Sequence, residues 1–79
     1  AMTARHYTIL IIEDDQLLNR LLGEQLVTAG YRVQGVHSLT DAEAWLKEHE
    51  CQLILTDMRL PDGSGLERLS SLAEQAPVV

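Results

Sequence analysis

The chain has 79 residues, of which 46% are hydrophobic and 23% are charged, so it is long enough for one small domain and too short for two. This composition excludes a disordered tail. Twelve acidic residues against six basic ones give a formal net charge of −6. The charge argues against direct nucleic-acid binding, because such surfaces depend on clustered Lys and Arg.

Cysteine usage and hydropathy indicate where the protein works. Cys51 is the only cysteine, which excludes an intrachain disulfide and is typical of a reducing compartment. No apolar run approaches the roughly 18–20 residues that a membrane-spanning helix needs, and the N-terminus lacks a signal-peptide pattern. We therefore expect a cytoplasmic protein without a membrane segment. Ala1 precedes Met2 and is interpreted as the remnant of a cleaved tag.

The first predicted elements are a strand and a helix. Residues 9–12 are Ile-Leu-Ile-Ile, an apolar run that extends back to Tyr7 and is typical of a strand covered on both faces in a parallel sheet. A helix follows, with Asp14 or Asp15 as its N-cap and Gly30 after its C-terminus. Its apolar stripe is predicted to face the core and its polar residues to lie opposite. The apolar set is Leu18, Leu21, Leu22 and Leu26, and the polar set is Asn19, Arg20, Glu24 and Gln25.

A second strand and helix are predicted next. Residues 31–36 form a weaker strand candidate, because a glycine interrupts them. The helix is expected to begin at Ser38 or Thr40 and to end near His49, and Thr40 and Glu43 have the spacing of a capping box. Its apolar positions are Leu39, Ala42, Trp45 and Leu46.

The third strand is predicted over residues 52–57. Residues 61–63, Pro-Asp-Gly, predict a turn. Ser64 and Glu67 again have capping-box spacing, at the start of a third helix. Residues 77–79 have the pattern of a fourth strand that has only begun. The apolar positions of the third helix are Leu66, Leu69 and Leu72.

Strands and helices alternate in this order, which indicates an α/β fold with a parallel sheet and right-handed crossovers. If the acidic residues 13–15 and Asp57 belong to one site, the first and third strands must be neighbours, and the strand order is 2-1-3. The acidic residues then lie at the topological switch point, where open α/β sheets bind ligands. We therefore expect an incomplete, doubly wound parallel sheet.

Acidic residues that crowd one site repel one another, so we expect a cation to offset their charge. Mg²⁺ fits, because it takes oxygen ligands and is usually held by one or two carboxylates together with a phosphate. A carboxylate beside such an ion can also be a nucleophile that forms an aspartyl phosphate. Taken alone, Asp14 or Asp15 would be a helix cap and Asp57 a solvated strand end, and Asp15 is expected to be only a cap. Together at the switch point, the acidic residues favour a functional site.

Two motifs carry a resemblance to a known family. Residues 9–15 are Ile-Leu-Ile-Ile-Glu-Asp-Asp, and Asp57 lies 43 positions after Asp14 within residues 55–66, Leu-Thr-Asp-Met-Arg-Leu-Pro-Asp-Gly-Ser-Gly-Leu. Both motifs, their separation and their places at strand ends resemble the response regulator receiver domains of bacterial two-component signalling. The resemblance implies the flavodoxin-like fold of the chemotaxis receivers.

The resemblance implies a role for each matching residue. Asp57 is expected to be the phosphoacceptor, and Glu13 and Asp14 the acidic pair that holds Mg²⁺ with it. Arg59 is expected to give a backbone carbonyl to the ion, and Met58 a backbone N–H to a phosphoryl oxygen. Such a domain accepts a phosphoryl group from a sensor histidine kinase and switches an output, which is often transcription. It is not expected to be an enzyme beyond its own phosphorylation and dephosphorylation.

The resemblance also implies that part of the domain is missing. A complete receiver continues through two further strands and helices, which carry a Ser or Thr and a Lys that contact the phosphoryl group. Lys47 is the only lysine here, and it precedes Asp57, so it does not match. We therefore expect residues 1–79 to be the N-terminal portion of one receiver domain, without an output domain. The sheet edge and helix face that such a portion leaves bare predict a homodimer or a domain-swapped assembly.

Two alternatives remain open. A degenerate or truncated receiver would act only as an interaction module, although the intact acidic residues argue against degeneration. A Toprim-like or haloacid-dehalogenase-like metal enzyme needs Asp-x-Asp, whereas residues 57–59 are Asp-Met-Arg and residues 13–15 are Glu-Asp-Asp. The remaining candidate groups are expected to be structural. They are Cys51 as an inert small apolar residue, Trp45 as half-buried packing, and His6, His37 and His49 as surface residues.

Overall fold

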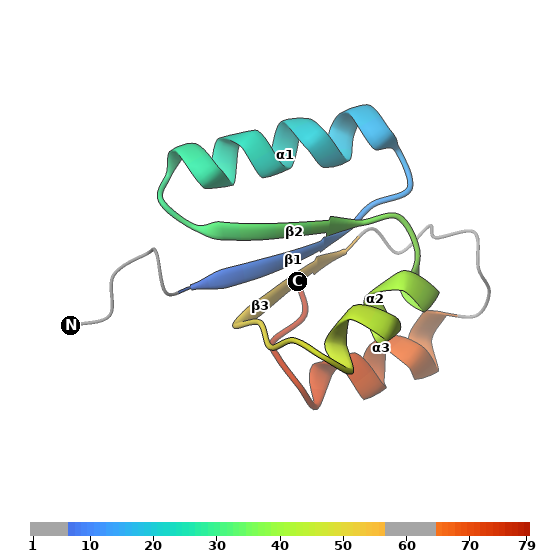
Figure 1. Cartoon of the computed structure of the whole chain (residues 1–79). Coiled ribbons are helices and arrows are strands. Elements are labelled where there is room, and N and C mark those ends of the chain that lie inside the picture. The colour runs from blue at the N-terminus through green and yellow to red at the C-terminus, as the bar shows by residue number, and fades with distance from the viewer. Residues whose placement is uncertain (1–6, 57–64) are drawn as a thin grey trace.

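The computed structural model describes residues 7–56 and 65–79. In this part of the chain, three parallel strands form a sheet in the order β2-β1-β3, with β1 at Thr8–Ile12, β2 at Arg32–Val36 and β3 at Leu53–Thr56. The helices are α1 at Gln16–Thr28, α2 at Leu39–Leu46 and α3 at Gly65–Ala73. α1 lies on one face of the sheet, and α2 and α3 lie on the other (Figure 1). The predicted fold class and strand order are confirmed.

β1 is the central strand, and its residues 9–12 are all buried. Because side chains alternate along a strand, Leu10 and Ile12 join the core beneath α2 and α3, whereas Ile9 and Ile11 point toward the α1 face. This two-sided burial explains the uninterrupted apolar run in the sequence. The core beneath α2 and α3 consists of Leu10, Ile12, Val36, Leu39, Ala42, Leu46, Cys51, Ile54, Leu69, Leu72 and Ala76.

Neighbouring residues cap both ends of α1. Asp15 is the N-cap, and its carboxylate accepts a hydrogen bond from the Leu18 N–H at 3.0 Å. At the other end, Gly30 has a φ of 103°, and the N–H groups of Gly30 and Tyr31 donate to carbonyls of the last turn. This is the Schellman arrangement, which favours glycine because its φ is positive. Both predicted end signals of α1 are confirmed.

The predicted faces of α1 are partly wrong. Leu18 and Leu21, predicted to face the core, are 41% and 46% exposed, and the other two leucines of the stripe are half-buried. Asn19, predicted to lie on the polar face, is only 7% exposed. The reason is local: the side of α1 at Asn19 approaches Gly35 of β2, where no side chain stands in the way and backbone carbonyls are available to an amide.

α2 begins at Leu39, directly after Ser38, which was the first of its two predicted start positions. The Ser38 hydroxyl is the N-cap and accepts a hydrogen bond from the Asp41 N–H at 3.0 Å, so Thr40 lies inside the helix. The capping box that Thr40 and Glu43 suggested is therefore wrong. The Thr40 hydroxyl instead accepts a hydrogen bond from Arg68 of α3 at 3.0 Å. α2 also ends slightly earlier than predicted.

The C-terminal residues extend the sheet beside β3. The Ile54 N–H donates to the Pro77 carbonyl at 2.8 Å, and the Val79 N–H donates to the Ile54 carbonyl at 2.8 Å. Ile54 and Val78 form an isolated parallel bridge, so the predicted start of a fourth strand is confirmed. The predicted turn at residues 61–63 lies outside the described residues. Within the described ranges, no helix has the length and apolar character to cross a bilayer.

Candidate functional site

The candidate site lies at the edge of the sheet where β1 and β3 end side by side. The two strands run parallel, and Ile12 pairs with Thr56. Glu13 and Asp14 follow Ile12 directly, so the acidic loop leaves the sheet beside the last residue of β3. The predicted adjacency of these two strand ends is confirmed.

Glu13 is buried at this edge, with 5% of its surface exposed. Its N–H donates to the Val36 carbonyl at 3.0 Å, and its Oε2 accepts a hydrogen bond from the Asp15 N–H at 3.0 Å. Its Oε1 accepts no hydrogen bond from residues 7–56 or 65–79. A cation is one partner that can satisfy a buried carboxylate oxygen.

Asp14 is exposed, and with Glu13 and Asp15 it forms a run of acidic residues at the N-terminal end of α1. The positive end of the helix dipole offsets part of their repulsion. Carboxylate oxygens are the ligands that Mg²⁺ prefers, so Glu13 and Asp14 fit two positions of a magnesium site. Among the residues that the structure describes, no group of three or more His, Cys, Asp or Glu side chains is placed to hold a metal ion.

The other predicted site residues, Asp57, Met58 and Arg59, lie outside the described residues. Asp57 follows Thr56, the last residue of β3, in the sequence. The roles assigned to these three residues stay predictions.

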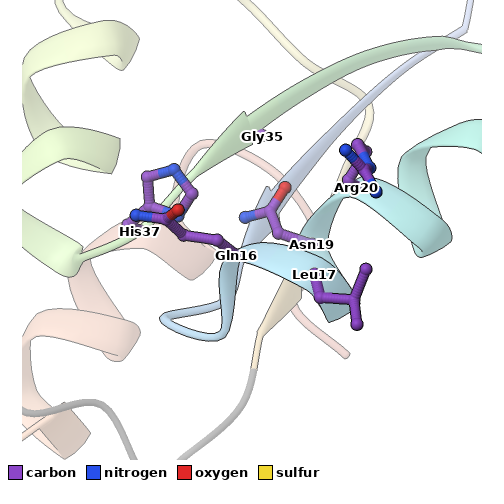
Figure 2. Close-up of a pocket in the computed structure, with 6 residues that line it drawn as sticks. All are labelled: Gln16, Leu17, Asn19, Arg20, Gly35 and His37. Carbon is purple, nitrogen blue, oxygen red and sulfur yellow. The ribbon is translucent and has the colours of Figure 1, made fainter.

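Asn19 is a site residue that sequence reasoning missed. Its Nδ2 donates to the Glu13 carbonyl at 3.0 Å and to the Val36 carbonyl at 2.8 Å. His37 Nδ1 lies 3.2 Å from the same Glu13 carbonyl. Figure 2 shows the Asn19 side chain extending from α1 toward Gly35 of β2. Both residues line a pocket of about 650 Å³. A polar residue on a helix gives no sequence signal for such a role, because its partners are backbone groups of two other segments.

The structure shows the burial of most of the residues that were expected to have only structural roles. Cys51 is buried, and this burial raises the pKa of its thiol. Trp45 is half-buried and stacks on the exposed His49 ring, with 4.6 Å between ring centroids. His37 is exposed, and His6 lies outside the described residues. The predictions for Trp45, His37 and His49 are confirmed, and the inertness of Cys51 stays a prediction.

Comparisons with known proteins agree with this geometry. The family model of the response regulator receiver domain matches residues 9–79. The swarming motility regulation protein RssB of Serratia marcescens is 41% identical over 61 residues, which cover 77% of this chain and 28% of RssB. The transcriptional regulatory protein GltR of Pseudomonas aeruginosa is 38% identical over 64 residues, which cover 81% of this chain and 26% of GltR.

A comparison with solved structures also finds a response regulator. The MaeR response regulator bound to beryllium trifluoride is 31% identical and superimposes with a TM-score of 0.80, over 92% of this chain and 64% of that one. The chain therefore spans about a quarter of the length of the two curated relatives and less than two thirds of the MaeR structure.

Proposed function

This chain belongs to the response regulator receiver domain family, and we propose that it is the N-terminal portion of a receiver that accepts a phosphoryl group on Asp57 from a sensor histidine kinase. The pairing of Ile12 with Thr56 carries the proposal, because it brings the loop of Glu13 and Asp14 beside the strand that Asp57 follows. The Oε1 of the buried Glu13, which has no donor within the described part of the chain, supports a cation at the same place.

In the proposed reaction, a carboxylate oxygen of Asp57 attacks the phosphorus of a phosphohistidine. A P–O bond forms and the P–N bond breaks, and its electron pair goes to the imidazole nitrogen, which then takes up a proton. Glu13, Asp14, Asp57 and the Arg59 carbonyl would hold Mg²⁺, which when bound supplies positive charge to the phosphoryl oxygens. The Met58 N–H would donate to one of these oxygens.

The proposed chemistry makes the protein a phosphoacceptor and not an enzyme that turns over a separate substrate. GltR is a transcriptional regulatory protein, and we propose transcription as the output of the longer polypeptide in which this sequence works. The net charge of −6 supports the proposal that this segment itself does not bind nucleic acid. We also propose a cytoplasmic location, where a histidine kinase would reach the site.

Mass spectrometry after incubation with acetyl phosphate and Mg²⁺ tests the phosphoacceptor. We expect the full-length polypeptide to gain one phosphoryl group, and Asp57→Asn or EDTA to abolish the gain. Asp62→Asn is the matched control, because it removes a carboxylate that has no predicted role in phosphoryl transfer and keeps a residue that suits the predicted turn, so it should leave the gain intact. The chain itself lacks a lysine after Asp57 and should gain the group more slowly. No gain in the full-length polypeptide, or a gain that survives Asp57→Asn, would refute the proposal.

We further propose that the chain pairs with a second copy. The observation in favour is that α1 exposes large apolar side chains, which on a small protein are costly to leave in water. These are Leu17, Leu18, Leu21 and Val27. Sedimentation velocity should show a dimer that the double variant Leu18→Ser, Leu21→Ser converts to a monomer, whereas Glu24→Gln on the same helix leaves it intact. A wild-type chain that stays monomeric at high concentration would contradict this assembly.

A further inference from the structure

We infer that Asn19 is a positioning residue that holds the loop of Glu13 and Asp14 in the conformation that binds Mg²⁺. The Asn19 amide fits in its place because Gly35 has no side chain. The inference rests on the proposed function, because it concerns the same magnesium site. It assigns part of the affinity for the ion to two residues that do not contact it.

The Asn19 amide ties three segments together. Its buried Nδ2 donates to the carbonyl of Glu13, which carries the buried carboxylate, and to the carbonyl of Val36 at the end of β2. Both partners are acceptors only, so the orientation of the amide is fixed, with Nδ2 toward the carbonyls. Its Oδ1 lies on the side of Gly35 (Figure 2). One side chain of α1 therefore links the acidic loop to β2.

The Glu13 carbonyl is an effective point at which to hold this loop. It belongs to the planar peptide that joins Glu13 to Asp14, so fixing its direction fixes the backbone from which both carboxylates extend. The Glu13 N–H is held as well, by the Val36 carbonyl at 3.0 Å. Without the Asn19 amide, the Glu13 carbonyl would keep only the exposed His37 ring as a hydrogen-bond partner within the described part of the chain. The loop would then have to be ordered when the ion binds, which lowers affinity.

Gly35 provides the space for this arrangement. A Cβ at Gly35 would overlap Asn19 Oδ1 and lie 3.2 Å from Asn19 Cγ. The φ of Gly35 is not positive, so its backbone conformation suits alanine and the requirement for glycine is steric alone. Gly35→Ala should therefore push the amide away from its two carbonyls while the strand itself stays intact.

Gly23 offers a matched control on α1. A Cβ at Gly23 would lie 3.6 Å from Val33 Cγ1, which is an ordinary van der Waals contact. Gly23→Ala adds the same methyl group between the same helix and the same strand without touching the Asn19 amide. It should leave the binding of the ion unchanged and favour the helix.

The test is isothermal titration of the protein with MgCl₂, on the wild type, Asn19→Ala, Gly35→Ala, the double variant and Gly23→Ala. Each single change at residues 19 and 35 should raise the Kd for Mg²⁺ about tenfold, as loss of an outer partner of a metal ligand typically does. The double variant should bind no more weakly than Asn19→Ala, because the amide that the added methyl group of Gly35→Ala would displace is already gone. Such non-additive changes in Kd are expected only if Gly35→Ala acts by displacing the Asn19 amide.

Two further measurements separate positioning from general stability. Leu72→Ala, a change in the core beneath α2 and α3, should lower the melting temperature but keep the Kd for Mg²⁺. Amide hydrogen exchange without metal should be faster at Glu13 in Asn19→Ala and Gly35→Ala than in Gly23→Ala. If Asn19→Ala does not fold, Asn19→Ser, whose hydroxyl can donate to one carbonyl, replaces it.

The outcomes distinguish the two proposals. A wild type that binds Mg²⁺ with an affinity unchanged by Asn19→Ala and Gly35→Ala would overturn the inference alone. Losses that add in the double variant would also overturn it. A wild type that binds no Mg²⁺ would overturn the proposed magnesium site and the inference with it.

Discussion

Arg68 of α3 contacts α2 through its guanidinium group, and a double-mutant cycle on this contact tests how the two helices are held together. Arg68 Nη2 lies 2.6 Å from Glu43 Oε1, and Arg68 Nε lies 3.3 Å from Glu43 Oε2. The side chains are 29% and 39% exposed, so the pair is partly shielded from water. Two parallel N–H···O contacts of this kind are the strongest geometry available to Arg and a carboxylate.

The magnitude follows from geometry and exposure. Exposed ion pairs contribute about 0.2–1 kcal/mol, and we expect about 1 kcal/mol for Arg68 and Glu43, because the contact is two-pronged and partly shielded. Arg20 and Glu24 on α1 form the internal control, with an N···O distance of 3.8 Å and side chains that are 71% and 66% exposed. Their coupling energy should be about 0.3 kcal/mol. For a domain of this size, a loss of 1 kcal/mol lowers the melting temperature by about 4–8 °C.

Urea unfolding of Arg68→Met, Glu43→Gln and the double variant measures the coupling energy, and the same cycle at Arg20 and Glu24 gives the reference. Arg68→Lys should recover less than half of the coupling, because an ammonium group cannot make both contacts. The coupling at Arg68 should also survive added salt better than that at Arg20. If the two cycles give equal coupling energies, the reasoning from shielding and two-pronged geometry is wrong.

Three further predictions concern capping, packing and reactivity. Asp15→Ala should lower the free energy of unfolding by about 1 kcal/mol because α1 loses its N-cap, whereas Asp15→Asn should keep most of it; equal losses in urea unfolding would contradict the cap. Leu72→Ala should cost about 2–5 kcal/mol in the same assay because Leu72 is fully buried, and a loss below about 1 kcal/mol would argue against the assigned core. Burial raises the pKa of the Cys51 thiol, so the thiolate fraction at pH 8 falls, and iodoacetamide should alkylate the folded chain at least about tenfold more slowly than the urea-unfolded chain.

The sequence by itself determined the elements and their order. The apolar run before Glu13 is a strand because four consecutive buried side chains need cover on both faces, and the structure provides it. Asp15 and Gly30 mark the ends of α1 because their roles depend only on the adjacent backbone. The strand order followed from the acidic residues at two strand ends, since a shared site requires those strands to be neighbours.

Only the tertiary structure decided which side chains these elements bury and bond. Thr40 and Glu43 have capping-box spacing, but residues three apart also share a face inside a helix, and Arg68 from α3 binds both. The pattern of α1 places the polar Asn19 on the solvent-exposed face. Asn19 is buried instead, because Gly35 leaves space for its side chain and the Glu13 carbonyl accepts its hydrogen bond. Local sequence patterns predict only the contacts that a residue makes with residues close to it in the chain. The partner that accepts a hydrogen bond, and the space that admits a side chain, come from segments that folding brings together.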